Sequence, residues 1–241
     1  MGTSSFSFRQ FTIWQDKCAM KVGTDGTLLG AWAYASQGTK QHILDVGTGT
    51  GLIAIMMAQR LPEAKVIGIE IDPVAASQAQ QNVTSSPFSS RVSISCQSFQ
   101  EHAKQAGLAV YDAIVCNPPF FSQSLTCPES RRTQARHTVS LTYTTLLQLS
   151  KAMLRPHGTL SVIIPTTERE KMEQAVAVAG MFCMKSCSVR TSERKSPKRL
   201  LLCFSKEPCD FEQQEMTIGD AYYQKLTNPF YMERKLTGNQ D

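Results

Sequence analysis

Residues 116–121 read Cys-Asn-Pro-Pro-Phe-Phe and directly follow an apolar run. Proline has a fixed φ and no backbone N–H, so Pro118 and Pro119 end the preceding strand and fix the direction in which the chain leaves it. The Asn117 amide oxygen and the Pro118 carbonyl are uncharged acceptors, and they suit an exocyclic amino nitrogen that becomes positive as it attacks an electrophile. Phe120 offers a face on which a base stacks, worth roughly 1–3 kcal/mol. The alternative is an Asn-Pro turn with exposed aromatic residues.

A second group of residues predicts a cofactor that contains adenosine. Gly47, Gly49 and Gly51 form a tight turn between a strand and a helix, and Glu70 ends the next strand, 19 positions after Gly51. An acid at that place accepts hydrogen bonds from ribose hydroxyls. The third glycine comes one residue too early for the dinucleotide fingerprint, and Asp45 suits a cationic ligand better than a pyrophosphate. These residues predict S-adenosyl-L-methionine, which leaves as S-adenosyl-L-homocysteine. Asp45 alternatively ties down the turn by accepting backbone N–H groups, and the two roles are compatible.

The adenine ring is expected next to Gln97, Ser98 or Phe99, where the third strand of the sheet ends. Ile71, which follows Glu70, is a further candidate for binding the cofactor. Many enzymes that use S-adenosyl-L-methionine have an aspartate here that binds the adenine amino group. No aspartate stands at this place, so the residue that reads the adenine is left open.

The elements that position these residues alternate between strands and helices. Strands are expected at 42–49, 65–72, 91–98, 111–117 and 158–165, helices at 52–61, 73–84, 143–154 and 168–180, and a final strand pair at 184–192 and 198–206. This alternation predicts an α/β fold with a doubly wound, mostly parallel Rossmann-like sheet and an antiparallel strand pair at its C-terminal edge. The chain is read as one domain over residues 1–241, with an N-terminal cofactor and substrate segment (1–40), a core (41–205) and a C-terminal arm (206–241).

The composition predicts a cytoplasmic protein without a metal. Hydrophobic residues make up 41% of the 241 residues, yet no window approaches the roughly 18 consecutive apolar residues of a membrane span. The N-terminus lacks the pattern of a signal peptide. None of the eight cysteines forms a Cys-x-x-Cys pair, which favours reduced structural thiols over a metal site. The net charge of +5 is compatible with an anionic partner without requiring one.

The motifs Asp-Val-Gly-Thr-Gly-Thr-Gly, Ile-Glu-Ile-Asp and Asn-Pro-Pro-Phe together resemble class I methyltransferases that modify amino groups. The segments 8–33, 131–137 and 222–232 resemble the bacterial tRNA1(Val) adenine-37 N6-methyltransferase family. The resemblance implies N6-methylation of adenine 37 in that tRNA, and it places Lys21, Thr24 and Asp25 in the cofactor pocket. Without it, Gly23 and Gly26 only predict a turn before an apolar helix. Alternatives are a guanine-N2 methyltransferase of ribosomal RNA, a protein-glutamine methyltransferase, and a cofactor-binding or RNA-chaperone module without enzyme activity.

Two basic groups are candidates for contacts with RNA. An enzyme that modifies a base needs that base flipped out or already single-stranded, as in a tRNA anticodon loop. The candidate phosphate contacts are Arg131, Arg132, Arg136 and His137 after the Asn-Pro-Pro-Phe motif, and Arg190, Arg194, Lys195, Lys198 and Arg199 near the final strand pair. The second group is equally compatible with a solvated charged surface.

Overall fold

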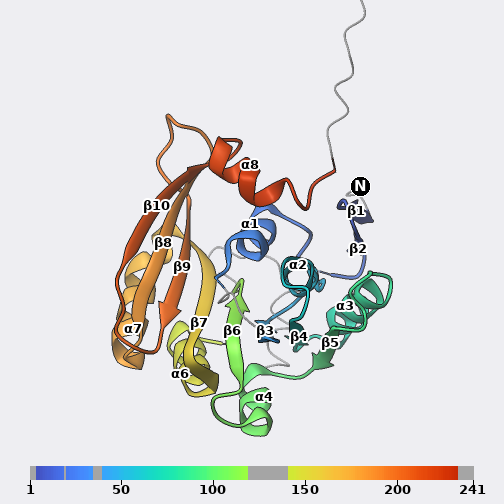
Figure 1. Cartoon of the computed structure of the whole chain (residues 1–241), viewed down its shortest axis with the longest axis horizontal. Helices are drawn as coiled ribbons and strands as arrows, with labels where there is room; N and C mark the ends of the chain where they lie inside the picture. Colours follow the sequence, from blue (N-terminus) through green and yellow to red (C-terminus); the bar gives the residue numbers. More distant parts are fainter. Residues whose placement is uncertain (1–3, 19, 35–39, 119–140, 233–241) are drawn as a thin grey trace, which may run out of the picture.

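The fold is a central β-sheet with helices on both faces (Figure 1). The computed structural model describes residues 4–18, 20–34, 40–118 and 141–232. The strands are β1 (Ser5–Ser7), β2 (Thr12–Trp14), β3 (His42–Val46), β4 (Lys65–Glu70), β5 (Val92–Cys96), β6 (Tyr111–Cys116), β7 (Leu154–Pro165), β8 (Phe182–Arg190), β9 (Arg199–Ser205) and β10 (Glu212–Thr217). The helices are α1 (Thr24–Trp32), α2 (Leu52–Arg60), α3 (Pro73–Thr84), α4 (Phe99–Ala106), α6 (Tyr143–Met153), the 3₁₀ helix η1 (Thr166–Glu168), α7 (Arg169–Ala179) and α8 (Ala221–Thr227).

The main sheet has the strand order β10-β8-β9-β7-β6-β3-β4-β5. Strand β9 is antiparallel to both of its neighbours, and the other adjacent strands are parallel. After β5 the chain crosses to the other side of β3 and forms β6, so the winding direction reverses between β3 and β6. Ligands of doubly wound sheets bind outside the carboxyl ends of the strands at such a point. The predicted fold class is confirmed.

Apolar residues form a core on each face of the sheet. Helices α1, α2, α3 and α8 cover one face, and α4, α6 and α7 cover the other (Figure 1). Helix α1 approaches α2 closely, since a Cβ on Gly26 would lie 3.2 Å from Leu52 and one on Gly30 would lie 2.8 Å from the sulfur of Met56. The contact moves from Gly26 and Leu52 to Gly30 and Met56, so the two helices run parallel to each other. The amino ends of α1 and α2 therefore lie side by side at the carboxyl edge of the sheet.

Several elements differ from the sequence prediction. The expected arm at 206–241 contains β10, which pairs in parallel with β8 and forms the edge of the sheet, and α8, which packs on α1. The predicted antiparallel pair, β8 and β9, is present but lies inside that edge. Strand β10 reads Glu-Gln-Gln-Glu-Met-Thr and buries only Met216, so it has no apolar alternation. Helix α4 was not expected either, because it buries only Phe99 and His102. Gly26 lies inside α1 and not in a turn before it.

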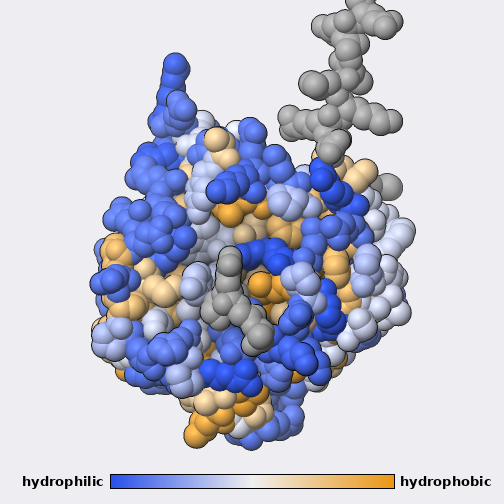
Figure 2. Space-filling view, in the orientation of Figure 1, coloured by the Kyte–Doolittle hydropathy of each residue, from blue (hydrophilic) through white to orange (hydrophobic). Residues whose placement is uncertain are grey.

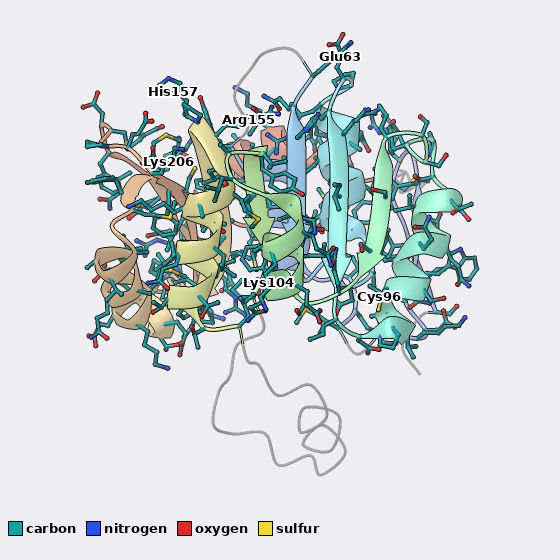
Figure 3. All side chains as sticks on the ribbon, turned by 90° about the horizontal axis from the view of Figure 1, so that it is seen from below. Glu63, Cys96, Lys104, Arg155, His157 and Lys206 are labelled. Carbon is teal, nitrogen blue, oxygen red and sulfur yellow. The ribbon has the colours of Figure 1, made fainter. Side chains whose placement is uncertain are left out.

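The two edges of the sheet are seen together in Figure 3. The amino edge carries Glu63, before β4, and Arg155 and His157, which belong to the start of β7. Cys96, the last residue of β5, lies at the opposite, carboxyl edge. The face drawn in Figure 2 is mostly hydrophilic, with smaller hydrophobic areas between the polar residues. Within the described residues, no helix is long and apolar enough to span a membrane.

Candidate active site

The turn between β3 and α2 requires its glycines because of backbone conformation. Gly47, Gly49 and Gly51 have φ values of 68°, 54° and 81°, which residues with a Cβ rarely adopt. A Cβ on Gly47 or Gly49 would meet nothing within 4 Å, so the space above this part of the turn is open. The N–H of Thr48 donates to the carbonyl of Ile69 on β4 at 2.9 Å, which fixes the turn against the neighbouring strand.

Asp45 lies beneath the turn and is completely buried. Its Oδ2 accepts hydrogen bonds from the Thr48 hydroxyl at 2.5 Å and from the N–H of Ala54 at 3.0 Å. Burial raises the pKa of Asp45 to about 7, the two hydrogen bonds oppose that rise, and the charge of Glu70 adds to it. The other oxygen, Oδ1, is buried without a hydrogen-bond partner among the described residues. Asp45 therefore ties down the turn, as the alternative reading expected, and keeps one acceptor atom unused.

Glu70, the last residue of β4, holds three backbone N–H groups. Oε2 accepts from Gly49 at 2.9 Å, and Oε1 accepts from Ile71 at 2.9 Å and from Asp72 at 3.0 Å. A carboxylate has about four acceptor positions, so one position on Oε2 remains for a ligand hydroxyl. The sequence placed Glu70 at this edge of the sheet but did not show that it also connects the turn after β3 to the turn after β4.

Asn117 follows β6, directly across the switch point from the turn after β3. Cys116 pairs with Val46, so the two strands end together at a spacing of about 4.8 Å. Asn117 Oδ1 is buried and has no hydrogen-bond partner among the described residues. Pro118 is buried as well. Pro119 and Phe120, the other two predicted catalytic residues, lie outside the described residues.

The predicted pocket residues before and in α1 lie at the same edge as the glycine turn. The amino end of α1 lies beside that of α2, which brings Thr24 and Asp25 to this edge, and Lys21 and Thr24 are exposed. Asp25 pairs with Arg199 at the start of β9, with Oδ2 2.7 Å from Nε. This pair gives Asp25 a cation from its own chain and connects α1 to β9.

Gln97 and Ser98 follow β5, as expected. Gln97 lies beside Glu70, whereas the Ser98 side chain caps helix α4. The N–H of Gln97 donates to the carbonyl of Glu70 at 2.9 Å, so Gln97 lies next to the predicted ribose site. Ser98 is the N-cap of α4 and forms a capping box with Glu101, in which its hydroxyl donates at 2.7 Å and accepts at 3.2 Å. Ile71 is 40% exposed beside Glu70 and offers an apolar surface at this edge.

Sequence reasoning missed how the N-terminal segment is held over the site. Asn82 on α3 is fully buried; its Oδ1 accepts from the N–H of Trp14, and its Nδ2 donates to the carbonyls of Trp14 and Thr50. One side chain thus connects β2 to the glycine turn. Burial raises the pKa of Cys18 in this segment to about 11, and the negative charges of Glu70, Asp72 and Asp16 add to that rise. No local pattern predicts the hydrogen bonds of Asn82, because their partners lie 68 and 32 positions away in the chain.

The predicted RNA contacts are described only in part. Arg131, Arg132, Arg136 and His137 lie outside the described residues. Residues 191–198 connect β8 to β9 at the carboxyl edge of the sheet, and within them Arg194, Lys195 and Lys198 are exposed. Arg190 pairs with Glu215 at 3.1 Å, and Arg199 pairs with Asp25. Arg194, Lys195 and Lys198 therefore face solvent. The connection that carries them is not the one nearest to the switch point.

The donors and acceptors of the site suit the cofactor that the sequence predicts. The unpartnered Asp45 Oδ1 matches a cationic or N–H-bearing ligand, and Glu70 Oε2 matches a hydroxyl. The open space over Gly47 and Gly49 admits a ligand close to the backbone. Among the described residues, no group of three or more histidine, cysteine, aspartate or glutamate side chains is arranged to hold a metal ion.

The switch point, the glycine turn and the glutamate that ends β4 define a Rossmann-like methyltransferase domain. The family model described as "Methyltransferase small domain" matches residues 25–179. The chain also has the fold of the crystal structure of a predicted O-methyltransferase from Agrobacterium tumefaciens, with a TM-score of 0.65 and 16% sequence identity, covering 85% of this chain and 96% of that one.

Relatives of known name show to which family of methyltransferases the chain belongs. A protein of Bacteroides fragilis named tRNA1(Val) (adenine(37)-N6)-methyltransferase is 42% identical over 239 residues, which is 97% of this chain and 100% of that protein. A protein of Porphyromonas gingivalis with the same name is 41% identical, over 96% of each chain. The chain belongs to this family, and the resemblance noted in its motifs is confirmed.

Proposed function

We propose that this protein uses S-adenosyl-L-methionine to methylate N6 of adenine 37 in tRNA1(Val). The observation that carries the proposal is Asn117 Oδ1, a buried acceptor that has no hydrogen-bond partner among the described residues and follows β6 at the switch point between β3 and β6. An acceptor at that position fits the hydrogens of an amino group. The family to which the chain belongs supports adenine and tRNA as the target.

The residues that would hold the cofactor lie on three neighbouring strand ends. Glu70 Oε2 would accept from a ribose hydroxyl, and Asp45 would face the cationic end of the ligand above the glycine turn. Ile71 and Gln97 would lie along the adenine ring, while Lys21, Thr24 and Asp25 would close the pocket from the side of α1. When bound, the cofactor supplies an electrophilic methyl group, which passes from sulfur to nitrogen while sulfur keeps the bonding electrons and one amino proton leaves to water.

Asn117 and Pro118 would act on the amino group of the target adenine. The lone pair of this nitrogen is delocalised into the ring, which makes it a poor nucleophile. Acceptors on its hydrogens favour the pyramidal geometry that attack requires and stabilise the positive charge as it develops. A neutral amide does this without forming an ion pair with the cationic cofactor. The remaining contribution is alignment of the nitrogen with the reacting carbon.

The RNA would approach the carboxyl edge of the sheet. Arg194, Lys195 and Lys198 lie on the connection between β8 and β9, two to three strand spacings from β6, or about 10–14 Å, so they would contact the RNA backbone away from the target base. Arg131, Arg132, Arg136 and His137 follow the Asn-Pro-Pro-Phe motif in sequence and stay predictions for the nearer phosphates. The anticodon loop suits this arrangement because adenine 37 is single-stranded there and extrusion costs less.

The test is methyl transfer to defined RNA. Purified protein is incubated with methyl-labelled S-adenosyl-L-methionine and unmodified tRNA1(Val), and ribonuclease fragments are analysed by mass spectrometry. We expect N6-methyladenosine at position 37, and no product on a transcript in which guanosine replaces that adenosine. The Asn117→Ala variant is the matched control for catalysis. Label on guanine-N2 of ribosomal RNA or on a protein glutamine would refute the substrate, and binding of S-adenosyl-L-homocysteine without any transfer would favour a module that is not an enzyme.

A further inference from the structure

A buried chain of polar side chains lies behind the carboxyl end of β5. His102 on α4 is 7% exposed and Tyr111 at the start of β6 is 2% exposed. The imidazole Nδ1 lies 2.9 Å from Gln97 Nε2, and Nε2 of the same ring lies 2.6 Å from the Tyr111 hydroxyl. The Gln97 Nε2 also donates to the Ser95 hydroxyl at 3.0 Å. The chain ends at Gln97, the residue after Cys96, at the carboxyl edge of the sheet where the adenine ring is expected.

The hydrogen bonds of this chain fix the orientation of the Gln97 amide. Burial lowers the pKa of His102, so the ring is neutral near pH 7 and carries one N–H. Gln97 Nε2 donates to Nδ1, which places the ring proton on Nε2, from where it is donated to the Tyr111 oxygen. Both hydrogens of the Gln97 amide nitrogen are then used on the inner side. The amide oxygen must turn the other way.

Gln97 Oε1 is the acceptor that this arrangement leaves at the edge. It takes no hydrogen bond from the described residues, and the Gln97 residue is only partly buried at this edge. The adjacent Ser98 hydroxyl is occupied by the capping box. The Gln97 backbone is bonded to Glu70, which keeps this oxygen next to the predicted ribose site.

We propose that His102 and Tyr111 are positioning residues that hold Gln97 Oε1 outward, where it accepts a hydrogen bond from the exocyclic amino group of the cofactor's adenine. The inference rests on the proposed function, because it takes S-adenosyl-L-methionine as the ligand. It names the adenine reader that the sequence left open and gives a role to a buried histidine that the reaction itself does not use.

The test compares two ligands that differ at one position of the ring. S-inosylhomocysteine has a carbonyl oxygen where S-adenosylhomocysteine has the amino group, so it would place an acceptor opposite Gln97 Oε1. We expect the unaltered protein to bind S-adenosylhomocysteine about 10–100-fold more tightly in isothermal titration, since the mismatch leaves two acceptors facing each other.

The variants separate orientation from packing. Tyr111→Phe keeps the ring but removes the acceptor of the His102 proton. The proton then moves to Nδ1, the amide turns, and the preference should be lost or reversed. His102→Leu removes the partner of the amide and should reduce the preference to less than about threefold. His102→Asn is the conservative control, because its Oδ1 can replace Nδ1 as an acceptor and should restore most of the preference.

The outcomes distinguish the inference from the proposed function. Failure of the unaltered protein to bind S-adenosylhomocysteine would refute the cofactor and the inference with it. Tight binding without a preference between the two ligands, or a preference that Tyr111→Phe leaves unchanged, would overturn the inference alone. Nitrogen NMR of the His102 ring in the free protein is an independent check. We expect a proton on Nε2 and none on Nδ1, and the opposite tautomer would also overturn it.

Discussion

The buried carboxyl of Asp45 couples cofactor binding to pH. Its pKa is raised to about 7 in the free protein, mainly by burial, so it is half protonated near neutral pH. A cationic ligand above the glycine turn favours the carboxylate over the carboxylic acid and therefore lowers this pKa on binding. Binding must then release a proton whenever the free protein holds one. Affinity should rise as the pH rises through 7.

The size of the effect follows from the protonation of the free state. With the pKa at about 7, roughly one tenth of the molecules carry the Asp45 carboxylate at pH 6 and roughly nine tenths at pH 8. If the bound form is ionised throughout, the dissociation constant for S-adenosyl-L-methionine should be about tenfold larger at pH 6 than at pH 8. Asp45→Asn keeps an oxygen of similar size but has no titrating proton, so its affinity should be weaker and should lack this dependence.

Isothermal titration at pH 6, 7 and 8 measures the effect. The amino group of the ligand also titrates in this range, but it does so for both proteins, so the ratio of the dissociation constants of Asp45→Asn and the unaltered protein isolates Asp45. Buffers of different ionisation enthalpy give the number of protons released. A ratio that stays constant from pH 6 to 8 would show that Asp45 does not titrate there or does not face the cation.

The same pKa gives the opposite sign for the stability of the free protein. The folded-state pKa of Asp45 lies above the ordinary value of 3.8, so the folded chain binds more protons than the unfolded chain between these values. The free energy of unfolding should therefore fall as the pH rises from about 4 through 7. Thermal melts at pH 5 and 8 should show a larger decrease for the unaltered protein than for Asp45→Asn. An equal decrease in both would contradict the assignment.

Four further substitutions test three separate parts of the site. Asn117→Ala should lower the single-turnover rate about 10²–10³-fold with little change in affinity for S-adenosylhomocysteine, and a parental rate would exclude Asn117 from catalysis. Glu70→Gln removes one acceptor oxygen from the group that holds Gly49, so affinity should fall by about 1.5–3 kcal/mol and the melting temperature should also fall; unchanged titrations would place the ribose elsewhere. Asp25→Asn should cost at most about 1 kcal/mol of stability, as should Arg199→Gln, because their ion pair is partly exposed, and a tenfold loss of cofactor affinity in Asp25→Asn alone would instead support a direct contact.

The sequence predicted the parts of the site whose physical cause is local. Closely spaced glycines between an apolar run and a helix predict a tight turn with positive φ values. Gly47 and Gly49 have such values. Glu70 was placed at the carboxyl edge because a strand of known direction ends there. Strand β6 likewise ends at Cys116, directly before Asn117 and Pro118, as the proline predicted. Each of these inferences depends only on neighbouring residues.

Contacts between distant parts of the chain were not predictable in the same way. Asn82 reads as an ordinary polar residue of a helix, yet it is fully buried and bonded to Trp14, 68 positions away. Asp25 and Arg199 were assigned to different ligands, although they are bonded to each other across 174 positions. A hydrophobic pattern predicts which face of an element is buried, but it does not name the partner of a polar side chain. Strand β10 shows the same limit, since parallel pairing with β8 requires no apolar alternation at an edge.

The unpartnered oxygens of Asp45 and Asn117 connect these observations to function. Leaving a buried acceptor without a hydrogen bond costs about 1–3 kcal/mol, and within the described part of the chain two such atoms lie at the ends of adjacent strands. Other buried polar atoms without a partner, such as Ser150 Oγ, lie elsewhere in the described structure. A buried atom without a partner therefore indicates function only when it also lies at the ligand edge of the sheet. If Asn117 lowers the stability of the free protein but binds the substrate, the Asn117→Ala variant should melt at the parental temperature or above it while losing activity. A residue retained for packing would show the reverse, with lower stability and a nearly normal rate.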